Sequence, residues 1–113
     1  IAAGGHFHQL YNLSLFYVVW IEQQFKDSIY PLKPVFDDIR HSYLLLDTNW
    51  HERRYIHHTP IHVDIINGRI WIQYDDTEEG IATDLLEAGV PAQDIVLGFR
   101  PPEVRSHTEF AVA

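Results

Sequence analysis

The chain has 113 residues, of which 46% are hydrophobic and 21% are charged, and it contains no cysteine. These values are typical of one globular domain, so we expect a single domain over residues 1–113, with residues 1–9 loosely ordered. The lack of cysteine excludes disulfides and thiolate zinc sites, and it fits a cytoplasmic protein. A formal net charge of -8 argues against non-specific binding to nucleic acid.

The segment Leu10–Ser28 is rich in apolar and aromatic residues, and its pattern favours a helix over a strand. Such a helix is apolar nearly all round, so we expect it to be buried on several sides or covered by a second subunit, as in a homodimer. Its longest apolar run, Leu13–Ile21, is shorter than the ~20 residues that span a membrane. The positions with helical spacing are Leu13, Phe16, Tyr17, Trp20, Ile21, Gln24 and Phe25.

The middle of the chain predicts strands. Pro31 and Pro34 end the first element, and a short edge strand over Val35–Ile39 follows. A second strand is predicted over Ser42–Trp50, and a turn over Asn49–Glu52. The longest extended stretch then runs from Arg53 to Ile66.

The end of that stretch alternates cleanly, with Ile61, Val63 and Ile65 on one face. The pair Asn67-Gly68 then predicts a tight hairpin turn, because both residues accept positive φ. The partner strand is expected over Arg69–Tyr74. Together these patterns predict an antiparallel sheet of about four strands.

A second helix is predicted directly after this sheet. Asp76 or Thr77 can accept hydrogen bonds from its first amides, and with Asp76 as the N-cap, Glu79 falls at the third helical position, which is the register of a capping box. Gly89 ends the helix, and Ile95–Leu97 is a strand or a core-filling segment. The expected buried stripe consists of Ile81, Ala82, Leu85, Leu86 and Ala88. The fold class is therefore α+β, with an N-terminal helix, the sheet, a C-terminal helix and a final buried segment.

Eight histidines make a metal site worth considering. His58, His62 and Asp64 share one parity on the long strand, which would place two imidazoles and a carboxylate on one face. However, His58 and His62 would be about 13 Å apart on a straight strand, and Pro60 between them interrupts the ladder or marks a bulge. The stronger interpretation is a solvated polar face, and we expect no bound cofactor or metal.

Three adjacent carboxylate pairs are candidates for acid–base chemistry. A general acid needs a desolvated carboxyl group with a raised pKa, whereas all three pairs fall at turns or at a helix start. Capping and solubility explain them better. The pairs are Asp37-Asp38, Asp75-Asp76 and Glu78-Glu79.

Trp50, Arg53, Arg54 and Tyr55 combine aromatic and cationic groups around one turn. These residue types dominate protein-binding hot spots, so the group is the candidate partner-binding site. The alternative is a loop tryptophan folded over the core with an arginine stacked on it.

The C-terminal part of the chain contains a series of short motifs that resembles the XisI family. The similarity extends more loosely back to about Tyr43, through Trp50, Arg53-Arg54 and Ile61–Ile65. The motifs are Gly68–Gln73, Asp76–Ala82, Gly89–Pro91, Asp94–Phe99, Pro102, Arg105 and Phe110–Ala113.

The resemblance implies a small α+β domain with an accessory role. The family comprises fdxN element excision controlling factors of cyanobacteria, which act with a recombinase and a companion protein, XisH, during heterocyst development. It implies no catalytic residues and no cofactor, so we expect a regulator that is not an enzyme and that binds an XisH-like partner. Two alternatives stay open: a metal-dependent hydrolase or nuclease using His58, His62 and Asp64, and DNA recognition by Arg53-Arg54, against which the net charge argues.

Overall fold

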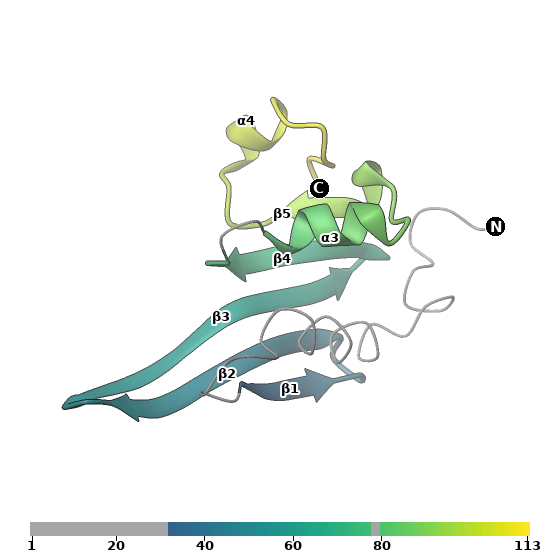
Figure 1. Ribbon diagram of the computed structural model, residues 1–113. Helices are drawn as coiled ribbons and strands as arrows, with labels where there is room; N and C mark the ends of the chain where they lie inside the picture. Colours follow the sequence, from purple (N-terminus) through teal and green to yellow (C-terminus); the bar gives the residue numbers. More distant parts are fainter. Residues whose placement is uncertain (1–31, 78–79) are drawn as a thin grey trace.

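The computed structural model describes residues 32–77 and 80–113, which form a mixed five-stranded sheet with two short α-helices (Figure 1). The strands lie in the order β1-β2-β3-β4-β5. Three parts of the prediction lie outside the described residues: the helix over 10–28, the loose N-terminus and Glu78-Glu79. The elements are β1 (Lys33–Asp37), β2 (Ser42–His51), β3 (Arg54–Ile66), β4 (Arg69–Asp75), α3 (Ile81–Glu87), the 3₁₀ helix η1 (Ala92–Asp94), β5 (Ile95–Leu97) and α4 (Pro102–Arg105).

Strands β1 to β4 form an antiparallel meander, as the sequence predicted. Asn67 and Gly68 have φ values of 50° and 76°, so both turn positions use the left-handed backbone that their residue types allow. The predicted turn over Asn49–Glu52 was wrong. Pairing continues to His51 and Arg54, and the turn consists of Glu52 and Arg53.

The fifth strand changes the predicted topology. β5 pairs with β4 in parallel, with Ile70 opposite Ile95 and Ile72 opposite Leu97. Because parallel neighbours need a crossover connection, α3 and η1 carry the chain back across the sheet between them. The α+β class is confirmed, and the antiparallel sheet of four strands has a fifth strand that pairs in parallel at its edge.

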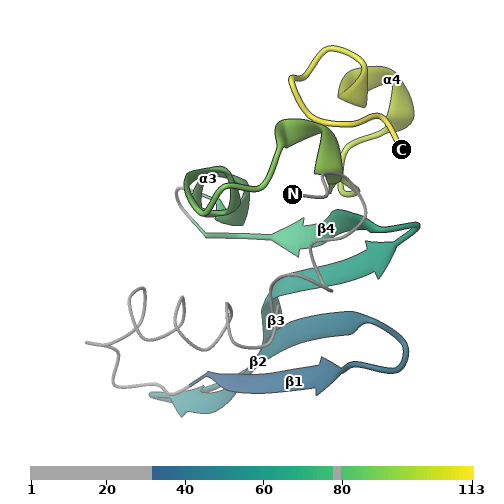
Figure 2. The same cartoon turned by 90° about the vertical axis from the view of Figure 1, so that its right-hand side faces the viewer.

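The core lies between α3 and one face of the sheet, called here the inner face (Figure 2). Ile81 and Leu85 are the helix residues that reach it, at 1% and 0% exposed, whereas Ala82 and Leu86 are partly buried and Ala88 is exposed. The sheet residues in this core are Tyr43, Leu45, Ile61, Val63, Ile65, Ile70, Ile72 and Ile95.

The start of α3 differs from the prediction. The helix begins at Ile81 after Gly80, and Asp76 does not cap it. The Asp75 carboxylate instead accepts hydrogen bonds from the Ile81 and Thr77 amides, at 2.6 and 2.9 Å. Asp75 lies opposite Ile61 at the end of β4, so the sheet itself holds the capping group in place.

The end of α3 matches the prediction. Gly89 has a φ of 98°, its amide bonds to Leu86, and the Val90 amide bonds to Leu85. This is the Schellman arrangement, in which glycine accepts the left-handed backbone and two terminal carbonyls gain donors. Val90, at 4% exposed, adds the apolar contact that accompanies the motif.

The last residues fold back onto β5. Ala111 forms a parallel bridge with Val96 and is buried, whereas Val112 is 48% exposed. The predicted buried segment Ile95–Leu97 is β5, in which Ile95 and Val96 are both 0% exposed. The Arg105 guanidinium lies 5.1 Å from the Trp71 ring centre and donates to the Val112 carbonyl at 3.0 Å. Arg105 thus ties α4 and the chain end to the outer face of β4.

Candidate functional site: the β2–β3 arm

The long β2–β3 hairpin extends beyond the rest of the sheet (Figure 1). β1 pairs with β2 only as far as Leu46, and β4 pairs with β3 only from Ile61 onward. The remaining part, called here the arm, consists of Asp47–His51 and Arg54–His58 joined by the turn. Among the described residues, the arm is a two-stranded ribbon with no further strand on either side.

A β-bulge separates the arm from the body of the sheet. Leu45 pairs with Ile61 but Asp47 pairs with His58, so β3 has two residues, Thr59 and Pro60, opposite Leu46 alone. The extra residue reverses the alternation of β3, and His58 therefore lies on the same face as Ile61. Pro60 is suited to this position because it has no N–H to give to a ladder.

The outer face of the arm carries the aromatic residues. Trp50 and Tyr55 lie directly opposite each other, with ring centres 5.1 Å apart and planes tilted by 50°. His57 continues the row, 6.4 Å from Tyr55 and nearly parallel to it. Trp50 is 62% exposed and Tyr55 52% exposed. The tryptophan therefore stacks on its cross-strand neighbour in solvent and does not fold over the core.

The tip of the arm carries two guanidinium groups. Arg53 lies in the turn, Arg54 is the first residue of β3, and both are exposed. Neither side chain forms a hydrogen bond, an ion pair or a ring contact with another described residue. The other described arginines all make contacts: Arg40 with Asp37, Arg69 with the Gln93 carbonyl, Arg100 with the Phe99 ring, and Arg105 with Trp71 and two carbonyls.

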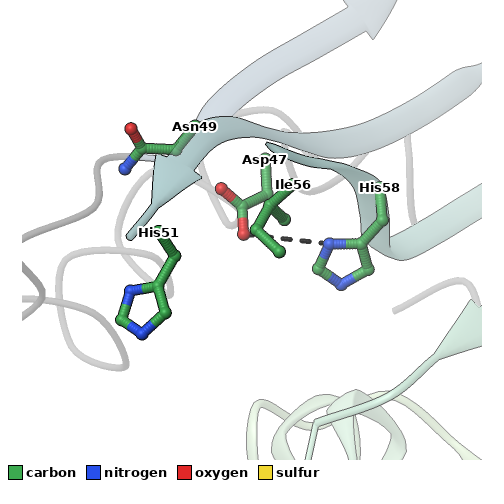
Figure 3. A pocket seen from close by; sticks show the side chains of 5 residues that line it. All are labelled: Asp47, Asn49, His51, Ile56 and His58. Carbon is green, nitrogen blue, oxygen red and sulfur yellow. Dashed lines mark ion pairs between the residues drawn. The ribbon is translucent and has the colours of Figure 1, made fainter. Parts of the chain in front are cut away.

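The inner side of the arm holds a shallow hollow of about 290 Å³ (Figure 3). Its lining side chains are Asp47, Asn49, His51, Ile56 and His58. His58 lies between two carboxylates, with Nδ1 3.8 Å from Asp47 and Nε2 3.1 Å from Asp76. These contacts tie the base of the arm to the end of β4.

A second polar group lies on the outer face of the body. Asp64 Oδ1 is 2.9 Å from His62 Nε2 and accepts a 2.7 Å bond from the Ser42 hydroxyl, while Gln73 donates to Oδ2 at 3.2 Å. Ser42 and His62 both contact the same oxygen of Asp64, and no hydrogen bond joins the imidazole to the hydroxyl among the described residues. This order is unlike that of a nucleophilic triad, in which the base bridges the other two groups.

The metal ligands of the alternative function, His58, His62 and Asp64, do not come together. His62 and Asp64 share the outer face, but the bulge at Thr59-Pro60 turns His58 to the inner face. Within residues 32–77 and 80–113, no group of three His, Cys, Asp or Glu side chains is arranged to hold a metal ion. Equal parity does not place His58 on the face of His62, because the interruption expected at Pro60 is a bulge that reverses the alternation of β3.

The described carboxylate pairs have local structural roles. Asp37 caps the turn after β1, and the backbone N–H of Arg40, aided by its guanidinium, holds the Asp37 pKa below its ordinary value. Asp38 accepts the Tyr43 hydroxyl at 2.8 Å. Asp75 caps α3 and Asp76 contacts His58. All four carboxylates thus have polar partners at turns or strand ends.

The structure thus places the four predicted partner-binding residues at one end of the molecule, on different sides of the arm. Trp50 and Tyr55 form the outer aromatic face, Arg53 lies in the turn, and Arg54 pairs with His51. Sequence reasoning missed the contacts of His58 and the inner hollow. No local signal could have found them, because they depend on the bulge and on the position of β4.

Comparison with known proteins shows the family to which this small α+β domain belongs. The family model described as XisI protein matches residues 15–112, so the chain belongs to the XisI family. A XisI-like protein from Anabaena variabilis is 30% identical, with a TM-score of 0.78 over 89% of this chain and 93% of that one. The fdxN element excision controlling factor XisI of the same organism is 32% identical, with a TM-score of 0.70 over 89% and 91%. The search of curated proteins gives no match.

The described helices are short. None of those in residues 32–77 and 80–113 has the length and apolar character needed to cross a membrane.

Proposed function

We propose that this chain is an accessory regulatory protein of the XisI type, which acts by binding a protein partner and catalyses no reaction itself. The partner that we propose is an XisH-like protein, and the process is the control of programmed DNA element excision in the cyanobacterial cytoplasm. Support comes from membership of the XisI family and from the structural similarity to an fdxN element excision controlling factor.

The observation that carries the proposal is the exposed Trp50–Tyr55 stack on the arm. Aromatic and arginine side chains supply most of the binding energy at protein interfaces, and here both kinds project from one hairpin. A two-stranded ribbon is also marginally stable in water by itself. A partner that packs on the outer face would bury the stack and hold the ribbon in place.

Co-expression with an XisH-like protein tests the proposal. Size-exclusion chromatography at micromolar concentration should give a stoichiometric complex. The Trp50→Ala variant should weaken that complex by about 30-fold or more, which is the range of a hot-spot residue. Tyr74→Ala is the matched control, because Tyr74 is 48% exposed on β4, away from the arm.

Separate elution of the two proteins would count against the proposed function. A complex that Tyr74→Ala weakens as much as Trp50→Ala would show that the partner binds the body of the sheet.

A further inference from the structure

We infer that the partner surface that receives the arm is acidic, and that Arg53 and Arg54 are the residues that recognise it. This inference deepens the proposed function and rests on it. It names the chemistry of the partner, and it assigns the arginine pair a role separate from that of the aromatic stack.

The distribution of charge is the first argument. The whole chain has a formal charge of -8, yet the arm carries only Asp47 and Glu52 against Arg53 and Arg54. Arginines elsewhere in the described parts of the chain are engaged with carboxylates, carbonyls or rings. The tip therefore presents two exposed guanidinium groups that no described residue engages.

The length of the arm is the second argument. Five residues of β2 extend beyond the body, which corresponds to about 16 Å at ~3.3 Å per residue. Physiological ionic strength screens exposed charges over ~8 Å, so the tip lies about two screening lengths from the acidic body. The potential near the tip is therefore set mainly by its own side chains, and an acidic protein can still approach an acidic partner there.

The chemistry of guanidinium favours a carboxylate surface. Its fork of N–H donors binds carboxylates in pairs of parallel hydrogen bonds, and both arginines are exposed enough to do so. Nucleic acid is the other acidic surface, but two cations would give a salt slope of only about -2, and the body would repel the phosphate backbone. The observations therefore favour an acidic protein.

The test measures binding of the XisH-like protein at 50 and 500 mM NaCl by isothermal titration calorimetry. The double variant Arg53→Gln/Arg54→Gln should bind about tenfold more weakly at low salt, and its affinity should change little with salt. The double variant Arg53→Lys/Arg54→Lys should keep the salt dependence. Lys33→Gln is the control, since it removes an exposed charge from β1.

The outcomes separate the two proposals. If the complex forms but the double glutamine variant binds like the unmodified protein, the acidic-surface inference is overturned and the proposed function stands. If no complex forms at all, both are overturned. A gel shift of duplex DNA that the glutamine variant abolishes would overturn the inference in favour of nucleic acid.

Discussion

The two halves of β3 belong to different environments. In the body, Ile61 and Val63 are at most 1% exposed and pack beneath α3. In the arm, Tyr55 is half exposed and neither strand has a second neighbour among the described elements. The contrast shows that one strand can both build a core and present a surface, provided that something fixes the boundary between the two.

The boundary is the bulge at Thr59-Pro60. It ends the regular ladder, reverses the side-chain alternation and lets β2 and β3 continue as a ribbon. His58, Asp47 and Asp76 then connect the base of the ribbon to β4. Stability is therefore expected to depend on the body, and recognition on the arm.

Two isoleucines of β3, one in the body and one in the arm, should show the largest difference in stability between the two regions. Ile61→Ala removes a fully buried side chain and should lower the free energy of unfolding by about 3–4 kcal/mol. Ile56→Ala makes the same change in the arm, where the side chain is partly exposed, and should cost about 1 kcal/mol. Urea denaturation measures both. Equal losses would mean that the arm is packed as tightly as the body.

A glycine after β5 tests how closely the outer side of the body is packed. A Cβ on Gly98 would lie 2.7 Å from Gln73 Oε1, 3.1 Å from the Trp71 ring and 3.2 Å from the Ile72 carbonyl. Gly98→Ala should therefore lower stability by about 1–3 kcal/mol. At Gly89 a Cβ meets no atom within 4 Å, and the cost of alanine there is mainly the φ of 98°. If Gly98→Ala unfolded at the same temperature as the unmodified protein, the close packing around Gly98 would be contradicted.

The cap of α3 distinguishes the observed helix start from the predicted one. Asp75→Ala removes the acceptor of the Ile81 and Thr77 amides and should cost about 1–2 kcal/mol. Asp76→Ala removes only a contact with exposed His58 and should cost less. If chemical denaturation showed a larger loss in the free energy of unfolding for Asp76→Ala than for Asp75→Ala, Asp76 would be the cap.

The smallest effect concerns pH. Burial, and then the hydrogen bond to Asp38 and its charge, raise the pKa of Tyr43 above its ordinary value of 10.0. The unfolded chain then loses this proton at a lower pH than the folded protein does, so stability should fall as the pH rises above about 10. Tyr43→Phe should show a shallower fall in the same range. Identical slopes for the two proteins would contradict the assignment.

Much of the sheet could be predicted because its signals are local. An apolar run located β2, alternation of apolar residues located β3 and β4, and Asn67-Gly68 located the turn between β3 and β4. Gly89 likewise marked the end of α3. The start of α3, by contrast, was misplaced, because the N-cap is Gly80 and not Asp76. The Asp75 carboxylate that accepts the Ile81 amide reaches the helix from a strand whose position depends on its pairing with β3. The direction of β5 was missed for a similar reason, since it depends on how α3 crosses the sheet.

The helix α4 was missed although its signals were present. Pro102 stands at its first position, Glu103 in the first turn and Arg105 in the last, which together are typical of a helix start and end. A single helical turn has too little periodicity to be recognised from the pattern of apolar residues.

The candidate site was predictable by composition and not by arrangement. Trp50, Arg53, Arg54 and Tyr55 have the residue types of an interface, and this is visible in the sequence. Their separation into an aromatic face and a cationic tip depends on the cross-strand register and on a turn two residues later than expected. Pro60 signalled an interruption of β3, but the reversal of alternation appears only when the partner strand is known.

Amide hydrogen exchange with and without the XisH-like protein tests the central claim most directly. In the free protein, amides of the arm should exchange faster than those of Ile61–Ile65 in the body. Binding should slow exchange in residues 47–58 and leave α3 and the body strands unchanged. Slower exchange confined to α3, α4 or the body, with the arm unaffected, would contradict the claim that the arm is the binding surface.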